Sequence, residues 1–261
     1  MLCITEKAQR VGLQGEYFMS GRIDDLECAY ATLYGFLQGR GEEAGRGDIW
    51  VMFDNEEVGS SSRQGAQGSL MSDVLARIEE SLGVTKEQSI RARTNCLLLS
   101  ADNGHAIHPN HPEKSDQKLP VNMGGGVILK YNARQTYTTS GLTGAAFTAI
   151  CEKAGVPVQT FANRADVAGG STLGNLLGRQ ILMPMVDIGV ASWPCTRRWK
   201  RPAARMRNIW PMPALPTTTP PSSSRRTGSG SWACERCRRA VRPQPQRAAP
   251  SGNLACSLLA C

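Results

Sequence analysis

The stretch Ile49-Trp50-Val51-Met52-Phe53, followed by Asp54-Asn55-Glu56-Glu57-Val58-Gly59-Ser60, decides the fold. Its five apolar residues predict a buried strand, and two adjacent carboxylates follow at the strand's end. Adjacent residues of an extended chain point in opposite directions. One carboxylate can therefore bind a metal while its neighbour transfers a proton, the division of labour in a metal-assisted hydrolase. A solvated turn has the same pattern, so the remaining ligands must come from elsewhere in the chain.

Three further segments place polar groups beside apolar elements. Residues 21–26, G-R-I-D-D-L, open a stretch with apolar residues at helical spacing, and residues 96–102, C-L-L-L-S-A-D, form a second apolar strand that ends in an acid. Residues 163–174, N-R-A-D-V-A-G-G-S-T-L-G, are a glycine-rich loop that leads into another helix. The acids therefore fall at strand ends and at a helix start.

The order of the predicted elements indicates the fold class. Apolar periodicity predicts helices over 25–38, 64–82, 143–154 and 173–180, and strands over 16–19, 48–53, 96–100, 127–131, 158–161 and 185–188. This alternation predicts an α/β domain in which helices pack on a mixed central sheet. Active sites of such sheets gather at strand ends, where Glu56, Glu57 and Asp102 are placed.

These motifs resemble those of the aspartyl aminopeptidase family, dinuclear zinc exopeptidases that include the vacuolar aminopeptidase I type. The matching motifs are R-I-D-D-L, F-D-N-E-E-V-G-S, S-A-D-N-G-H-A-I-H-P-N, G-V-I-L-K and R-A-D-V-A-G-G-S-T-L-G, in the family's order within residues 1–191. The resemblance implies a zinc exopeptidase-like fold, which is incomplete here because the upstream half of the catalytic domain and the family's oligomerisation domain are missing. It also implies two divalent metal ions, Zn²⁺ first among them, a peptide substrate and a family of homo-oligomers, although this chain lacks the domain through which the family assembles.

The resemblance also implies roles for four acidic residues. Asp24 would bridge two metals, with Glu57 a ligand of one and Asp102 a ligand of the other. Glu56 would be the general base that takes a proton from the metal-activated water and carries it to the leaving amine. The expected reaction is the release of N-terminal amino acids, acidic ones among them, from peptides.

Substrate contacts are expected from two further residues. The resemblance places His108 and Lys130 at the substrate, where Lys130 would suit an acidic side chain by charge pairing; a solvated lysine at a strand end is the alternative. His111 precedes a proline in a loop and is better interpreted as a solvated histidine than as a ligand. Arg164 and Asp166 could form a loop ion pair near the site or a surface pair of little energetic weight.

Two histidine ligands of the family are not where the resemblance requires them. One belongs to an H-x-D-S-P motif upstream of the bridging carboxylate, and Met1 comes only a strand before Asp24. The other belongs to an L-A-M-H-S motif after residues 185–189, where this chain reads S-W-P-C-T-R-R-W-K. Codons for residues 192–210 read one base earlier can give Q-L-A-M-H-S-A-M-E-T-A-G-R-K-D-A-E-Y-L. We therefore expect residues 1–191 to be a partial metallo-aminopeptidase catalytic domain and residues 192–261 to be out-of-frame translation.

Composition changes at the same point of the chain. Residues 192–261 hold 13 Lys and Arg against a single acid, Glu235, and ten of the 15 prolines. Such a segment buries too little apolar surface to offset its chain entropy, so we expect a disordered basic tail without a packed element. The tail alone produces the net charge of +8 and the pI of about 9.2. A specific nucleic-acid partner is therefore not expected.

The rest of the composition indicates the compartment. The cysteines outside the tail, Cys3, Cys28, Cys96 and Cys151, lie in apolar settings and are typical of reduced core thiols. No signal peptide or membrane span is recognisable, so we expect a cytoplasmic protein with no membrane partner.

Two function hypotheses remain open. One is a metal-dependent aminopeptidase, and the other is a truncated, inactive family fragment that binds metal or peptide weakly. The three predicted metal ligands are all carboxylates, and carboxylate-only sites favour Mg²⁺ or Mn²⁺ over Zn²⁺.

Overall fold

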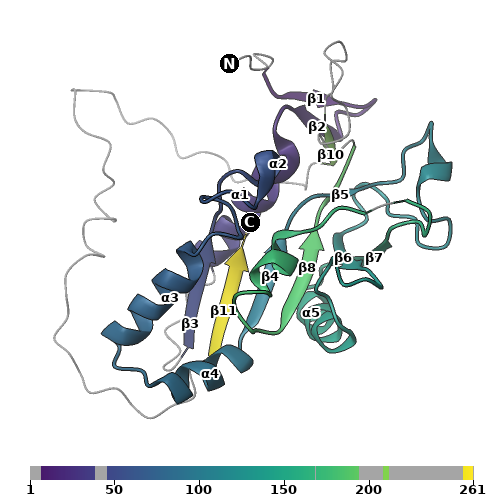
Figure 1. Ribbon diagram of the computed structural model, residues 1–261. Coiled ribbons are helices and arrows are strands. Elements are labelled where there is room, and N and C mark those ends of the chain that lie inside the picture. Colours follow the sequence, from purple (N-terminus) through teal and green to yellow (C-terminus); the bar gives the residue numbers. More distant parts are fainter. Residues whose placement is uncertain (1–6, 39–45, 168, 194–207, 212–254, 261) are drawn as a thin grey trace, which may run out of the picture. The chain divides into compact units, whose positions relative to one another are not determined.

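The computed structural model describes residues 7–38, 46–167, 169–193, 208–211 and 255–260 (Figure 1). All of them belong to one compact unit. Within these residues, no helix combines the length and the apolar character needed to cross a membrane.

A six-stranded mixed sheet forms the centre of this unit. Its strands, in spatial order, are β3 (Arg46–Val51), β11 (Ala255–Ala260), β4 (Leu97–Ala101), β8 (Met185–Gly189), β6 (Val127–Tyr131) and β7 (Val158–Ala162). Every neighbouring pair is parallel except β6 and β8, which are antiparallel. The predicted mixed sheet is therefore confirmed, and its buried strands carry the near-continuous apolar runs that a sheet covered on both faces needs.

Helices cover both faces of this sheet. On one face, α1 (Ile23–Gln38) and α5 (Gly141–Lys153) contribute Cys28, Phe147 and Cys151 to a core that includes Val186 of β8. On the other face, α3 (Leu70–Ser81) and α6 (Leu173–Leu177) pack with Leu98 of β4. The α/β class with helices packed on a sheet is thus confirmed.

Local sequence signals explain where two of the helices begin. Ser140 caps α5 by accepting a hydrogen bond from the backbone of Thr143, whose side chain bonds back to Ser140. The same reciprocal capping box, from Thr85 and Gln88, starts α4 (Lys86–Thr94). Each box provides partners for backbone N–H groups that a helix start leaves unpaired.

Smaller elements complete the unit. β1 (Gln9–Val11), β2 (Tyr17–Ser20) and β10 (Asn208–Pro211) form an antiparallel sheet, and β5 (Gly104–His105) pairs in parallel with β9 (Ala191–Ser192). Two short helices are α2 (Glu56–Gly59) and the 3-10 turn η1 (Pro112–Lys114).

The helix predicted over 64–82 is wrong at its start, because α3 begins at Leu70. Residues 61–69 form turns that hold two glycines at close backbone contacts. A Cβ on Gly65 would lie 2.4 Å from the carbonyl oxygen of Ser60. Apolar periodicity does not register this packing requirement, so the sequence pattern extended the helix too far.

The expectation that residues 192–261 contain no packed element stays a prediction, and the structure describes only short parts of that segment. Ser192 is buried at the end of β9, and β10 and β11 both pair with strands of the preceding region. The remainder of the predicted tail, 194–207, 212–254 and 261, lies outside the described residues, and the frameshift itself stays a hypothesis.

Candidate metal centre

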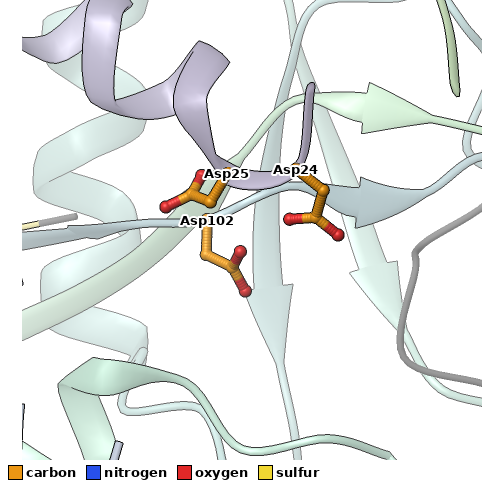
Figure 2. Close-up of side chains that lie close together, drawn as sticks. All are labelled: Asp24, Asp25 and Asp102. Atoms are coloured by element: carbon orange, nitrogen blue, oxygen red, sulfur yellow. The ribbon is translucent and has the colours of Figure 1, made fainter. Parts of the chain in front are cut away.

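Three carboxylates converge where α1 begins and β4 ends. One ligand oxygen each from Asp24, Asp25 and Asp102 lie within 4.8 Å of one another, and Figure 2 shows the three side chains together. Carboxylate oxygens at this separation can bind one divalent cation jointly. The structure thus brings together two predicted ligands, Asp24 and Asp102, and adds Asp25.

Backbone features place these side chains. Asp24 has φ −83° and ψ 111°, outside the helical region although it lies in the first turn of α1. Asp102 follows directly after β4, beside Gly189 at the end of β8. A Cβ on Gly189 would lie 2.0 Å from the carbonyl oxygen of Asp102, so only glycine allows this close approach.

The electrostatics of Asp25 fit a cation. Burial raises the pKa of its carboxyl group far above the usual range, and the charges of Asp102 and Asp24 raise it further. Its Oδ1 is buried without a hydrogen-bond partner. A buried, unpaired carboxylate oxygen among like charges is costly unless a positive charge joins it. The residues present therefore fit a metal ion.

Lys130 supplies a counter-charge from the sheet. Its ammonium is almost fully buried on β6, 3.4 Å from Oδ2 of Asp102, and donates a 2.9 Å hydrogen bond to the carbonyl oxygen of Asn103. Burial lowers the pKa of Lys130, but the nearby carboxylates, Asp102 above all, outweigh it and hold the pKa above its usual value. The lysine is thus neither solvated nor exposed to a ligand in this structure, and its substrate contact stays a prediction.

A second layer of polar groups supports the cluster and was not predicted from the sequence. The Asn103 side chain donates to Glu27 at 3.2 Å and accepts from the Cys28 thiol at 3.5 Å. Burial raises the pKa of Glu27 to about 8 and also raises that of Cys28. Glu27 and Cys28 lie in the first helical turn after Asp24, whose own dihedral angles are not helical. Helical spacing from Asp24 therefore does not predict their place, and the contact of both residues with Asn103 appears only in the structure.

The Glu pair is not part of the described carboxylate cluster. Glu56 and Glu57 form the first turn of α2, with Glu56 half-buried and Glu57 exposed. In the part of the chain that the structure describes, Glu57 is not among the side chains that share the 4.8 Å cluster. Their roles as base and ligand stay predictions.

His108 lies in an aromatic group rather than among the carboxylates. Its ring centroid is 5.8 Å from that of Trp193 and 5.5 Å from that of His111. His111 is exposed and pairs with Glu113 at 3.3 Å, in line with a solvated histidine. The described carboxylate cluster contains no histidine.

Arg164 and Asp166 form an ion pair in an exposed loop, the surface pair of the two alternatives. Nε and Nη2 of Arg164 donate to the two carboxyl oxygens of Asp166 at 2.6 and 2.5 Å, and Arg164 also donates to the carbonyl oxygen of Glu113. Both pair members are exposed, and Arg164 borders a surface cavity of about 430 Å³ whose lining does not include the carboxylate cluster. The pair is therefore a surface feature.

Known proteins with similar sequences place this site in context. A sequence model of the family described as aminopeptidase I zinc metalloprotease (M18) matches residues 1–195. A relative from Clostridium novyi (strain NT), named "Probable M18 family aminopeptidase 2", is 41% identical over 184 residues, which are 70% of this chain and 42% of the relative. A protein of the same name from Mycobacterium tuberculosis (strain H37Rv) is 41% identical over 172 residues, 65% of this chain and 40% of the relative.

A solved structure supports the fold. The S. cerevisiae mApe1 dodecamer superposes with a TM-score of 0.63 at 25% sequence identity, over 79% of this chain and 44% of that one. The chain spans about two fifths of the length of the curated relatives that it matches. The family match covers the residues that form the carboxylate cluster and most of its supporting sheet, and the chain therefore belongs to the aminopeptidase I zinc metalloprotease (M18) family.

Proposed function

We propose that this chain carries part of the metal centre of an aminopeptidase that releases N-terminal amino acids, acidic ones among them, from peptides. The observation that carries the proposal is the cluster of Asp24, Asp25 and Asp102, with its unpaired buried oxygen, in a member of a zinc metalloprotease family. Zinc accepts carboxylate ligands but commonly takes histidine as well, so these three residues would supply only part of the centre.

Each acidic residue has a proposed task. Asp24, Asp25 and Asp102 would hold one ion, and Glu57 would help to hold the second. A bound divalent ion supplies Lewis acidity, which activates water and polarises the peptide carbonyl. Glu56, half-buried at the start of α2, would accept a proton from the water and return it to the leaving amine.

The proposed substrate contacts depend on the same charges. Lys130 would pair with an acidic side chain at the substrate's N-terminus, and His108 would lie on the same side of the substrate. In the structure the ammonium of Lys130 is bound to Asp102. To contact a substrate, Lys130 would have to leave Asp102 and the carbonyl oxygen of Asn103, its partners in the structure.

A second candidate function is a metal-binding fragment without turnover. The described cluster contains only carboxylates, and Glu57 lies outside it. Oxygen donors alone favour Mg²⁺ or Mn²⁺ and leave a zinc ion poorly held. On this account the chain binds metal weakly and hydrolyses nothing.

Assembly and location complete the proposal. The mApe1 relative is a dodecamer, which supports a homo-oligomer for this family, and a peptide is the expected substrate. The described cysteines, Cys28, Cys96 and Cys151, are buried free thiols, which supports a reducing, cytoplasmic location.

Two linked measurements test the proposal. Isothermal titration with Mn²⁺ and Zn²⁺ should show saturable binding that Asp24→Asn and Asp102→Asn each weaken, while Glu80→Gln, an exposed carboxylate on α3, leaves it unchanged. Absence of binding, or equal binding by all variants, would exclude the metal centre.

Hydrolysis of aspartyl and glutamyl chromogenic substrates then separates the two candidates. Metal-dependent turnover that Glu56→Gln abolishes identifies an active aminopeptidase. Metal binding with a rate equal to that of Glu56→Gln identifies the inactive fragment.

A further inference from the structure

The central sheet contains a strand position that the family-matched residues do not fill. β3 and β4 run parallel to each other, but β11 lies between them and pairs with both (Figure 1). β3 and β4 belong to residues 1–195, which match the family, whereas Ala255–Ala260 lie outside that match. The strand position is therefore built by the family domain and occupied by a segment from elsewhere.

The side chains of β3 and β4 beside this position determine which kind of strand fits between them. Ile49 and Val51 of β3 pack with the core under α3 and α6, as does Leu98 of β4, while Leu97 and Leu99 pack with the core under α1 and α5. Beside the gap, both faces of β4 are thus apolar, and so is the face of β3 toward α3 and α6. A strand here must be uncharged, apolar on both faces and parallel to its neighbours. The sequence Ala-Cys-Ser-Leu-Leu-Ala is uncharged and, apart from Ser257, apolar.

The occupant also links the two halves of the predicted centre. β3 leads directly to α2, which carries Glu56 and Glu57, and β4 leads directly to Asp102. In the described sheet pairings, β11 is the strand that joins β3 to β4. Whatever fills the gap therefore sets the distance between the Glu pair and Asp102.

We propose that the gap between β3 and β4 is a strand-acceptor site for an extended, uncharged, apolar segment that adds in parallel. Residues 255–260 occupy it in this structure, although they lie outside the residues that match the family. Strand addition draws its affinity from backbone hydrogen bonds on both sides and its specificity from the alternating side chains.

The test opens the site in the full chain. Leu258 is the register partner of both Ile49 and Leu98, so Leu258→Pro removes a backbone donor at the centre of β11. Leu215→Pro is the matched control, since it makes the same change within residues 212–254. Amides of 49–51 and 97–100 should exchange with deuterium about tenfold faster in Leu258→Pro than in the wild type or in Leu215→Pro.

A labelled peptide then probes the opened site. A fluorescein-tagged peptide of residues 251–261 should bind the Leu258→Pro chain saturably and about tenfold more tightly than the wild-type or Leu215→Pro chain. The same peptide carrying proline at position 258 should not bind. If Leu258→Pro does not fold alone, refolding with the wild-type peptide should restore the circular dichroism of the wild type.

Three results would overturn the proposal. Unchanged exchange at 49–51 and 97–100 would show that β11 does not occupy the gap. The gap would also not be a strand-acceptor site if a folded Leu258→Pro chain did not bind the wild-type peptide, or if it bound the proline peptide as tightly as the wild-type peptide. Failure of the peptide to rescue an unfolded Leu258→Pro chain would have the same meaning.

Discussion

Asp187 should be a strong determinant of stability, because its carboxyl group joins three separate segments. The side chain lies on β8 with 0% exposure. One oxygen accepts from the hydroxyl of Ser100 on β4 at 2.5 Å, and the other accepts from the backbone N–H of Thr138 at 2.5 Å and from its hydroxyl at 2.8 Å. The Ser100 hydroxyl in turn accepts from the N–H of Gly174 in α6.

The isosteric change Asp187→Asn cannot satisfy all of these donors. With the amide oxygen toward Thr138, the NH₂ group faces the Ser100 hydroxyl, whose own proton loses its acceptor. In the opposite orientation the NH₂ group faces the N–H of the half-buried Thr138, and that backbone amide loses its acceptor. Either way one buried or half-buried donor is orphaned, which costs roughly 1–3 kcal/mol, and the hydrogen bonds that remain are weakened by the loss of charge.

Urea unfolding followed by circular dichroism measures this cost. We expect Asp187→Asn to lower the unfolding free energy by about 2 kcal/mol. Asp166→Asn, which breaks the exposed pair with Arg164, should leave the unfolding free energy unchanged within the error of the measurement. Equal stability of Asp187→Asn and the wild type, with an unchanged urea slope, would refute the argument that the buried donors need this carboxyl group.

Three other predictions concern single positions, each measured by urea unfolding. Gly189→Ala should destabilise the fold by at least roughly 1–3 kcal/mol, because its Cβ would meet the carbonyl oxygen of Asp102. Gly35→Ala on α1, where a Cβ would have no atom within 4 Å, should stabilise the fold by about 0.5–1 kcal/mol. Equal effects of the two changes on the unfolding free energy would contradict the packing at Gly189. The folded pKa of Glu27, about 8, exceeds its ordinary value of 4.5, so between these pH values the folded state holds more protons than the unfolded state and stability falls as pH rises. Glu27→Gln should reduce this slope by less than about 1 kcal/mol per pH unit, and an unchanged slope would show that burial does not hold the proton there. Thr85→Ala removes the cap of α4 and should cost about 1 kcal/mol, and a neutral result would mean that the cap is replaced by water.

Apolar strands could be predicted from the sequence because their pattern is local. Residues 127–131 and 185–188 read as strands, and β6 and β8 cover them. α4 was missed because its residues, K-E-Q-S-I-R-A-R-T, carry almost no apolar periodicity. Its capping box was the available signal.

The site could be predicted only for those residues that belong to a recognisable sequence motif. Asp24 and Asp102 follow from motifs. The contact of Lys130 with Asp102 joins residues from separate strands, and the sequence of neither segment determines how these strands are aligned. The same limit applies to β11. Its six residues are unremarkable in sequence, and their place between β3 and β4 depends on a gap that only the assembled sheet creates.

The thiol of Cys28 gives the carboxylate cluster a built-in reporter. It is 2% exposed, bonded to Asn103 and held in its protonated form by burial, so an alkylating reagent can reach it only when α1 separates from the sheet. The rate of Cys28 alkylation is therefore limited by how often this helix opens, and not by how often the reagent collides with the protein. An ion held by Asp24, Asp25 and Asp102 would fasten α1 to the end of β4 and slow that chemistry, which makes the kinetics of a single cysteine a measure of occupancy that does not depend on catalysis.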